Sequence, residues 1–328
     1  MAYNRVGTPK FYIDAALLAR QWGQIDTENE AGKYHLNPSK VTQVEEGGVH
    51  LVFKTRHWLN SLEHAFILGH NFKTEGDEDS GIGIYFQVNI SGATTTYGVV
   101  GSSTDLKTFD LNGWDKFDIA SDIKGYDSKE ILLYVTNVSD ALDGVFTLGD
   151  ISIGWTYEMQ HSPDLELNLS YSNESIKTQT TLSGNTLTSA GWSHQPQWIR
   201  GAWSKGIDTN VYPSHYPGRR NWKLKFSYLS DNDTDNPLFP QYYNETDIGN
   251  TPNTNWGIFE KIGEDYHIKK DFISRLYAGT NSFQLPFIFQ PDSNSEEYAI
   301  CRVNTNTMSF KQVANNVYDI SLNITETW

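Results

Sequence analysis

The chain has 328 residues, of which 38% are hydrophobic and 13% aromatic, and it carries 25 Lys and Arg against 40 Asp and Glu, a formal net charge of −15. A length of this order suits about two domains, and the negative charge excludes a surface built to neutralise nucleic-acid phosphates. Because Cys301 is the one cysteine, an intramolecular disulfide framework and a cysteine-rich zinc site are also excluded.

The first predicted element is a short helix over residues 14–22. Asp14 stands in the position of an N-cap, an Ala/Leu-rich body follows, and Gly23 comes directly after the predicted end. Asp is favoured at N-caps because its carboxylate accepts a backbone N–H of the first turn. Gly is favoured after the last turn because it readily adopts left-handed backbone angles. A helix this short is expected to pack on a sheet.

Alternation of apolar with small or polar residues predicts β-strands along most of the chain. Such a period of two is typical of strands with one buried face. It runs through residues 82–90, 165–171, 222–228 and 318–324, and shorter apolar runs occupy 49–53, 65–68, 131–135 and 145–153. Clusters of Gly, Asn, Asp and Ser separate these runs, as in turns between strands. The pattern predicts a mainly β fold in which 165–171 and 176–181 form a long hairpin.

One further segment, residues 264–278, has the pattern of an amphipathic helix. Its apolar residues recur at helical spacing, its later turns are basic, and Gly279 follows its end. This helix is expected to lie across a sheet. The preceding segment, 230–257, is rich in Asn, Asp, Thr and Pro and predicts a long surface loop, of the kind that often contacts other molecules.

These elements divide the chain into three predicted parts. Residues 1–27 form an N-terminal arm with the short helix, 28–157 a β-sandwich, and 158–328 a second β domain with one packed α-helix. The first residues lack the basic end and apolar stretch of a secretory signal, and no run of about 18 apolar residues offers a membrane span. We therefore expect synthesis in the cytosol and no membrane insertion.

Two clusters contain residue types that bind metal ions. Acidic residues alternate in segment 231–235 as in the first half of a calcium loop, but the Gly and Glu of such a loop do not follow. His57, His64 and His70 lie close together in sequence without helical spacing. A solvated turn and structural histidines are the favoured interpretations, so we expect no metal and no cofactor. Nucleophile motifs and phosphate-binding loops are missing from the sequence, and no enzymatic activity is expected.

The aromatic residues fall into two groups. Those at alternating strand positions are expected in a core, whereas those in a strand-poor stretch are expected at an interface, where Trp anchors contacts between proteins. The expected core residues of the second β domain are Trp222, Phe226, Tyr228, Phe287, Tyr318 and Leu322. The expected interface residues are Trp192, Trp198 and Trp203.

A series of segments in the second half of the chain carries a family resemblance. They are residues 161–165, 176–180, 184–187, 218–230, 284–291, 298–302 and 318–328. Their order of strands, helix, Pro-Phe strand, hairpin and last strand resembles the tube-like domain of tail proteins of tailed bacteriophages, which tail-tube, distal-tail and baseplate-hub proteins share. Residues 65–72 are similar to a strand and turn in the β-sandwich domains of other phage virion proteins.

The resemblance implies a fold, a function and partners. It implies a tail-tube-like ring domain in residues 158–328, preceded by a galectin-like or carbohydrate-binding-like accessory sandwich. It also implies a structural virion protein, made in the host cytoplasm, of the distal-tail or tail-tip ring that joins the tail tube to the tip or baseplate. The implied partners are further copies in a hexameric ring and other tail proteins. Arg219 and Arg220 are expected to meet acidic neighbours, because guanidinium pairs with carboxylate through two hydrogen bonds.

Other functions stay open from the sequence. The sandwich precedes the tube-like domain, unlike in typical distal-tail proteins, so another tail-tip, baseplate or adaptor role is an alternative. A carbohydrate-binding receptor module of the tail-fibre type would place exposed aromatics against a host surface glycan, and the candidates are Trp58, Tyr85, Tyr97 and Trp114. A polysaccharide-degrading enzyme would need two carboxylates roughly 5 to 10 Å apart in a cleft.

Overall fold

The structure is a computed structural model of the whole chain. It describes residues 7–24, 42–44, 49–52, 62–70, 84–90, 93–99, 113–118, 130–135, 146–164, 168–172, 176–190, 219–233, 235–240, 270–304 and 308–327. Strands far outnumber helices among these residues, which confirms the predicted mainly β class. The described strands form one sheet of ten strands, one of four and two of two.

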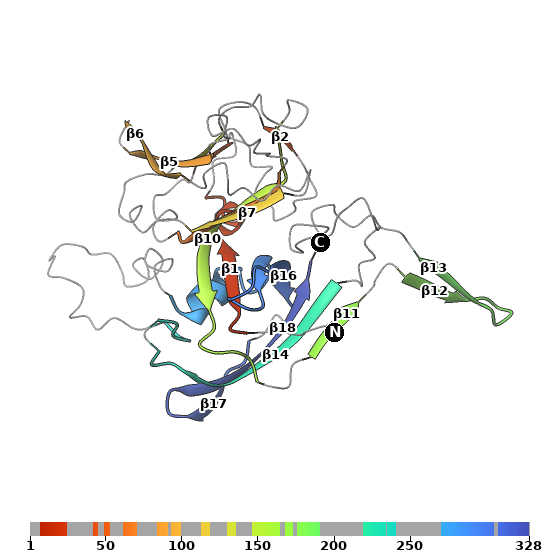
Figure 1. Cartoon of the computed structure of the whole chain (residues 1–328). Coiled ribbons are helices and arrows are strands. Elements are labelled where there is room, and N and C mark those ends of the chain that lie inside the picture. Colours follow the sequence, from red (N-terminus) through yellow and green to blue (C-terminus); the bar gives the residue numbers. More distant parts are fainter. Residues whose placement is uncertain are drawn as a thin grey trace.

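The ten-stranded sheet organises the molecule (Figure 1). Its order is β11, β14, β18, β16, β15, β1, β10, β4 and β7, and β17 pairs with β18 beside that path. The bounds are β1 Lys10–Asp14, β4 His64–His70, β7 Gly113–Asp118, β10 Asp150–Glu158, β11 Asn168–Ser172, β14 Arg219–Ser230, β15 Phe287–Gln290, β16 Ala299–Val303, β17 Lys311–Ala314 and β18 Val317–Glu326. All of these pairings are antiparallel.

Strand β1 lies in the middle of this sheet. Phe11 is in register with Tyr157 of β10 on one side and with Phe289 of β15 on the other. The sheet therefore takes strands from all three predicted parts of the chain and continues through the boundaries predicted at 27/28 and 157/158. The first strand of the predicted N-terminal arm is thus an integral part of the main sheet, since both of its edges are paired.

Three smaller sheets complete the described strands. The four-stranded sheet has the order β3 (Val49–Val52), β8 (Glu130–Val135), β5 (Ile84–Ile90) and β6 (Ala93–Val99). The two-stranded sheets are β2 (Thr42–Val44) with β9 (Phe146–Leu148), and β12 (Ile176–Thr180) with β13 (Thr186–Ala190). The strands of residues 28–157 thus belong to three different sheets, and the sandwich predicted there stays a prediction.

The long hairpin predicted from residues 165–171 and 176–181 is wrong. β11 pairs instead with β14, where Leu169 is in register with Trp222, and β12 pairs with β13, the strand that follows it. Alternation identifies a strand but does not identify its partner, because an apolar face can be buried against any neighbour in the sheet. Tertiary contacts therefore determine that β11 pairs with β14, a strand far along the chain.

The first predicted helix is confirmed. α1 spans Ala15–Gln21, and the Asp14 carboxylate accepts the backbone N–H of Leu17 at 2.9 Å, as an N-cap does. At the other end Gly23 has φ +64° and the two backbone hydrogen bonds that close a helix around a left-handed glycine. Both ends are therefore set by local sequence signals.

The second helix differs from its prediction. η8 spans Ile273–Ala278 and is wound as a π-helix, while residues 264–269 lie outside the described part of the chain. Gly279 does not adopt the expected left-handed conformation, because its φ is −61°. A Cβ at this position would lie 2.0 Å from the carbonyl oxygen of Arg275, so glycine is needed here for close backbone approach. The left-handed residues come later, at 281–283.

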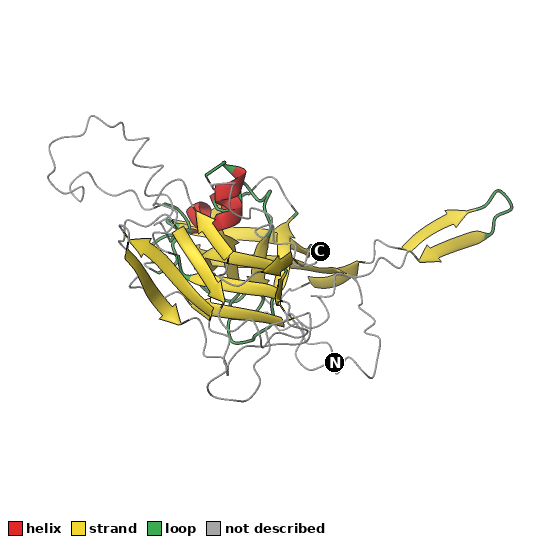
Figure 2. Cartoon of the chain, turned by 90° about the horizontal axis from the view of Figure 1, so that it is seen from above, coloured by secondary structure: helices red, strands yellow, loops and turns green. Residues whose placement is uncertain are grey.

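The larger core lies on one face of the ten-stranded sheet, and both helices pack against β10 beside it (Figure 2). Its largest fully buried side chains are Phe11, Trp155, Tyr157, Phe226, Phe272 and Phe287. A smaller cluster of Tyr12, Leu17, Phe66, Leu68, Ile288, Tyr298 and Ile300 is buried separately. Because successive side chains of a strand point to opposite faces, Phe11 and Tyr12 belong to different clusters.

Five of the six residues predicted for this core contribute to it. Trp222, Phe226, Phe287 and Leu322 are buried, and Tyr318 packs against them half-buried. The sixth prediction is wrong, because Tyr228 is 75% exposed. The register of β14 against β18 shifts between Phe226 and Leu229, so Leu229 takes the inward position. One extra residue in the strand is enough to reverse the direction of a side chain.

Candidate functional site: a projecting hairpin and an edge of the main sheet

The hairpin of β12 and β13, residues 176–190, projects from the body of the molecule, and we call it the arm (Figures 1 and 2). Its strands pair with each other and with no other strand that the structure describes. Between residues 178 and 187 every side chain is exposed except the half-buried Thr181. Neither face of this part is covered, although isolated two-stranded hairpins are only marginally stable in water.

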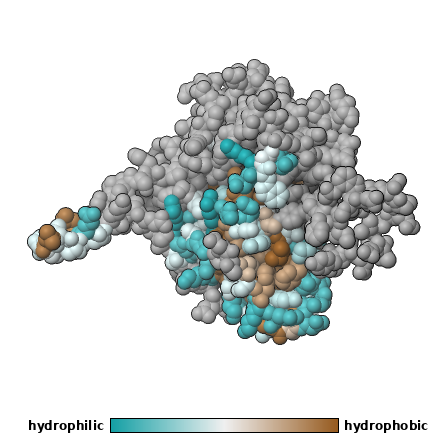
Figure 3. Space-filling model, turned by 180° about the vertical axis from the view of Figure 1, so that it is seen from behind, coloured by the Kyte–Doolittle hydropathy of each residue, from teal (hydrophilic) through white to brown (hydrophobic). Residues whose placement is uncertain are grey.

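The tip of the arm is apolar. Leu182 is fully exposed and Leu187 is 59% exposed, and Figure 3 shows hydrophobic residues at the end of the hairpin. The N–H of Thr181 donates to the carbonyl of Asn185 at 2.8 Å, and the N–H of Gly184 donates back to Thr181 at 2.9 Å. Gly184 has φ +82°, which glycine adopts at low cost. The tip therefore has a defined turn that holds Leu182 outward.

A second surface carries the bulge of β14 and the strand β17, and we call it the β14/β17 end; β17 lies at the bottom of Figure 1, away from the arm. Tyr228 has φ +62°, and its backbone N–H donates to Oδ1 of Asp319 at 3.1 Å. Among the described strands β17 pairs only with β18, and all its residues are exposed. Val313, at the register shift of β17, is 39% exposed. This end presents the exposed Tyr228 on β14 and, on the other side of β18, the outer edge of β17.

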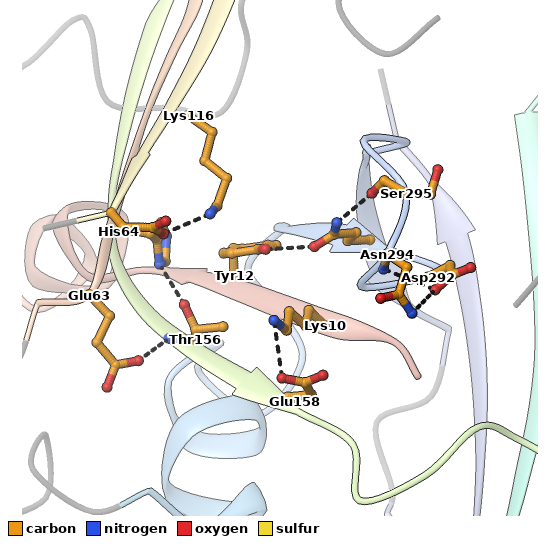
Figure 4. A network of polar contacts seen from close by, with 12 residues as sticks. Lys10, Tyr12, Glu63, His64, Lys116, Thr156, Glu158, Asp292, Asn294 and Ser295 are labelled. Carbon is orange, nitrogen blue, oxygen red and sulfur yellow. Dashed lines mark hydrogen bonds and ion pairs between the residues drawn. The ribbon is translucent and has the colours of Figure 1, made fainter. Parts of the chain in front are cut away.

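Polar groups from several strands meet on the side of the sheet where Tyr12 is buried (Figure 4). The hydroxyl of Tyr12 donates to Oε1 of Gln290 at 2.6 Å, and Nζ of Lys116 lies 5.5 Å from the centre of the Tyr12 ring. Burial raises the pKa of Tyr12 well above its ordinary value, so the phenol keeps its proton. Nδ1 of His64 lies 3.2 Å from Oγ1 of Thr156. These contacts tie β1, β4, β7, β10 and β15 together.

Two fully buried ionisable residues flank Gly154 in the same sheet. Asp14 and His64 are in register with Gly154 from its two sides, and a Cβ on Gly154 would lie 1.8 Å from the Ile13 carbonyl oxygen. Burial raises the pKa of Asp14 to about 7, although the N–H of Leu17 opposes the shift. Burial, with nearby cations, lowers the pKa of His64 well below its ordinary value. The His64 ring is therefore neutral at pH 7.

A buried ion pair joins η8 to the sheet. Arg275 donates to both carboxylate oxygens of Glu63, at 2.7 and 2.8 Å, and to the carbonyl of Thr156. The N–H of Thr156 in turn donates to Oε2 of Glu63 at 3.1 Å. Arg275 is only 4% exposed, so the pair stands largely out of water. The ion pair holds η8 against β10, and its two charges are paired with each other inside the fold.

The two arginines predicted for an interface lie at the start of β14. Arg220 donates to both carboxylate oxygens of Glu326 at 3.0 Å, and its guanidinium lies 5.1 Å from the centre of the Trp222 ring. The expected pairing of arginine with a carboxylate is present, but the partner belongs to the same chain. Arg220 thus joins the ends of β14 and β18. Arg219 beside it is half-buried.

The remaining predicted contact residues lie outside the part of the chain that the structure describes in full. Trp58, Trp192, Trp198 and Trp203 are outside the described residues, as is His57. Tyr85, Tyr97 and Trp114 lie on β5, β6 and β7, and of these three residues the backbone alone is described. The predicted interface and glycan contacts therefore stay predictions.

The alternating aspartates of segment 231–235 make the contacts of a turn. Oδ1 of Asp233 accepts the N–H groups of two residues that follow it, and Oδ1 of Asp231 accepts the N–H of Phe239 at 2.9 Å. Within the described residues no group of three or more His, Cys, Asp and Glu side chains is placed to hold a metal ion. Leu238 is fully buried, so the predicted surface loop 230–257 enters the core near its start.

No protein-family model, curated protein or solved structure matches the chain. In the described residues no helix is long and apolar enough to cross a membrane. The surfaces of the chain itself are therefore the basis for a function. Two of them, the arm and the β14/β17 end, present large apolar side chains to solvent and include strand edges that have no partner among the described strands.

Proposed function

We propose that this chain is a structural protein of a phage tail, a distal-tail or tail-tip ring component of the virion that joins the tail tube to the tip or baseplate. It acts by binding further copies of itself, as a hexamer, and neighbouring tail proteins. The observation that carries the proposal is the arm, whose exposed part has no covered face and ends in Leu182. Its assignment to a phage tail rests on the sequence resemblance.

The arm supports an assembly role because its apolar tip gains free energy only when another molecule covers it. Burying a leucine side chain contributes roughly 1.5–3 kcal/mol relative to leaving it in water. An arm on one side of a subunit that binds a different surface of the next subunit makes a head-to-tail contact, and such contacts close into rings when the rotation permits. A protein that worked alone would gain nothing from this exposure.

The strand edges support the same role. The path of the ten-stranded sheet ends at β11 and β7, and β17 adds a third edge among the described strands. Unpaired strand edges bind other chains readily, and proteins that assemble can use them as contact surfaces. In a ring each edge would lie beside a neighbouring subunit, which removes it from solvent.

Light scattering of the purified chain over a range of concentrations, with electron microscopy of the same samples, tests the proposal. We expect rings of about six copies, the implied hexamer, since closed cyclic symmetry is the common outcome of self-assembly. L182D should abolish assembly, because it places a charge on the tip, whereas Q284E places the same charge at an exposed position in the turn after η8 and should assemble normally.

Two outcomes would contradict the proposal. A chain that stays monomeric at every concentration would favour the receptor-module alternative, and a glycan-binding screen would then be the appropriate experiment. Rings that form equally well from L182D would show that the arm has no part in assembly. The far-ultraviolet circular dichroism of both variants should match the unsubstituted chain, because each change lies at an exposed position.

A further inference from the structure

The large hydrophobic side chains that the described residues expose gather mostly in two places. They are Trp22, Leu182, Leu187, Tyr228 and Val313. Two belong to the arm and two to the β14/β17 end, and Figure 1 shows the arm projecting on the right and β17 at the bottom, apart from each other. Single exposed hydrophobic residues are ordinary, but exposed hydrophobic residues that gather in one place favour contact with a partner. The two regions are therefore suited to bind each other between copies and not within one chain.

The backbone at the β14/β17 end holds Tyr228 outward against its own preference. A φ of +62° is unfavourable for a residue with a bulky side chain. The hydrogen bond from the Tyr228 N–H to Asp319 keeps this conformation, and Leu229 fills the inward position that the strand pattern would give to Tyr228. Strained conformations that the surroundings maintain tend to mark functional sites.

Strand β17 pairs with the same end of β18 as the β14 bulge does, but on the opposite side of β18. Gln312 of β17 and Leu229 of β14 are both in register with Tyr318, so the two strands flank one stretch of β18. All residues of β17 are exposed, and Val313 adds an apolar side chain at its register shift. This edge of β17 has no partner among the described strands, so an incoming strand would pair with it, and Val313 on β17 and Tyr228 on β14 stand on the two sides of β18.

The charges of the two regions are compatible. The arm, residues 176–190, contains Lys177 and no Asp or Glu, although the whole chain has a net charge of −15. The β14/β17 end carries Asp319 and, in register with it on β17, Lys311, and it lies beside segment 231–235 with its three aspartates, whose Asp231 N–H donates to the Asn316 carbonyl at the turn between β17 and β18. An arm without negative charge approaches this acidic end without like-charge repulsion.

We propose that the arm of one copy docks on the β14/β17 end of the next copy, with Leu182 against Tyr228 and Val313. This inference rests on the proposed function and specifies its subunit contact. The contact joins two different surfaces, so it repeats head to tail around a ring. The arm supplies a preformed strand pair and the acceptor supplies a free edge and an aromatic ring.

Disulfide trapping tests this contact directly. L182C and V313C are made as two separate proteins, mixed and oxidised, and the products are separated by denaturing electrophoresis without reductant. We expect a covalent dimer from the mixture and a ladder of oligomers from the double variant L182C/V313C. The native Cys301 is fully buried, so it does not compete for the introduced thiols. L182C mixed with R302C is the matched control, because Arg302 is exposed on a different strand.

Each result has a clear meaning. Cross-linking of L182C with V313C, and not with R302C, supports the proposed contact. Rings in light scattering without this cross-link would overturn the contact and leave the assembly role standing. A dimer of L182C alone that is as abundant as the mixed product would assign the arm to an arm–arm contact and overturn the proposal. A chain that neither cross-links nor assembles contradicts both the contact and the proposed function.

Discussion

Asp14 combines an N-cap with a fully buried carboxyl, and this combination makes the stability of the protein depend on pH. Burial raises its pKa in the folded protein to about 7, from an ordinary value of 3.8. Between these values the folded carboxyl keeps a proton that the unfolded chain has released, so raising the pH favours unfolding. The slope of this contribution approaches about 1.4 kcal/mol per pH unit. The stabilising contribution of Asp14 is fully present below pH 3.8 and is lost as the pH rises through about 7.

We predict that D14N removes this slope while keeping the helix cap, because Asn also caps helices well. The free energy of unfolding in urea, measured across the same pH range, should fall with pH in the original chain relative to D14N. His64 has the opposite effect: because its pKa is lowered in the folded protein, the protein loses stability as the pH falls below 6.5, the ordinary pKa of histidine. Both proteins contain His64, so its effect cancels in the difference between them. Parallel pH profiles for both would contradict the assignment.

The Arg220–Glu326 pair should stabilise the fold more than a surface ion pair does. The Glu326 side chain is 5% exposed and that of Arg220 22%, so removing the carboxylate leaves a guanidinium partly out of water. We predict that E326Q costs about 3 kcal/mol, measured by urea unfolding. E158Q is the control, because the Lys10–Glu158 pair is 28% and 35% exposed and should be worth less than about 1 kcal/mol. Equal losses in both variants would contradict a special role for Arg220.

Residue-scale features were predictable where a local signal sets them. The Asp14 cap and the left-handed Gly23 follow from side-chain and backbone chemistry within a few residues. Tyr228 was not predictable, because the alternation of β14 continues through it and the register shift depends on how β14 meets β18. The same limit applies to Arg220, whose residue type favours a carboxylate partner but does not say whether that partner lies in the same chain.

At the scale of elements, the close approach of β1 and β10 at Gly154 holds the centre of the main sheet together. A Cβ there would lie 1.8 Å from a backbone carbonyl oxygen of β1, so the two strands would have to separate. We predict that G154A costs at least about 3 kcal/mol, because backbone atoms cannot move aside as side chains can. The loss should appear in thermal unfolding followed by far-ultraviolet circular dichroism.

G184A is the matched control for this prediction. Gly184 has open space around its Cβ position and φ +82°, so alanine there strains the turn by about 1–2 kcal/mol without a clash. Because the surrounding residues are exposed, the strain stays in the arm and the unfolding of the body should not change. If G154A unfolds at the same temperature as G184A, then β1 is not a central strand of the sheet.

Element pairing shows where sequence reasoning ends. The strands themselves, such as β14 and β18, were predicted from their alternation, because one face of each is buried. The arm was misassigned because residues 176–181 were paired with the strand before them. The sequence did contain a signal, since residues 178–186 place a large apolar side chain only at Leu182 and therefore have no face to bury.

At the scale of the whole molecule, the main sheet contains strands from segments that the sequence composition assigns to different parts of the chain. β1 and all of β10 except Glu158 come from residues before the boundary predicted at 157/158, and β15 comes from residues after it, yet β1 pairs with both β10 and β15. Local composition could not reveal this, because a strand carries no mark of which distant strand completes its hydrogen bonds. For the same reason, the metal, glycan and interface predictions could rest only on residue types, because the sequence does not say which residues the fold brings together.

The net charge of −15 gives the last prediction, which concerns assembly. Copies of an acidic chain repel one another over about 10 Å at an ionic strength near 0.1 M, and added salt shortens this range. The proposed arm contact is mainly apolar and does not weaken with salt. We therefore predict that light scattering will show a larger oligomeric fraction at higher salt, and that K177E, which makes the arm acidic, will need more salt than the original chain. Dissociation on adding salt would assign the contact to ion pairs and contradict an apolar arm.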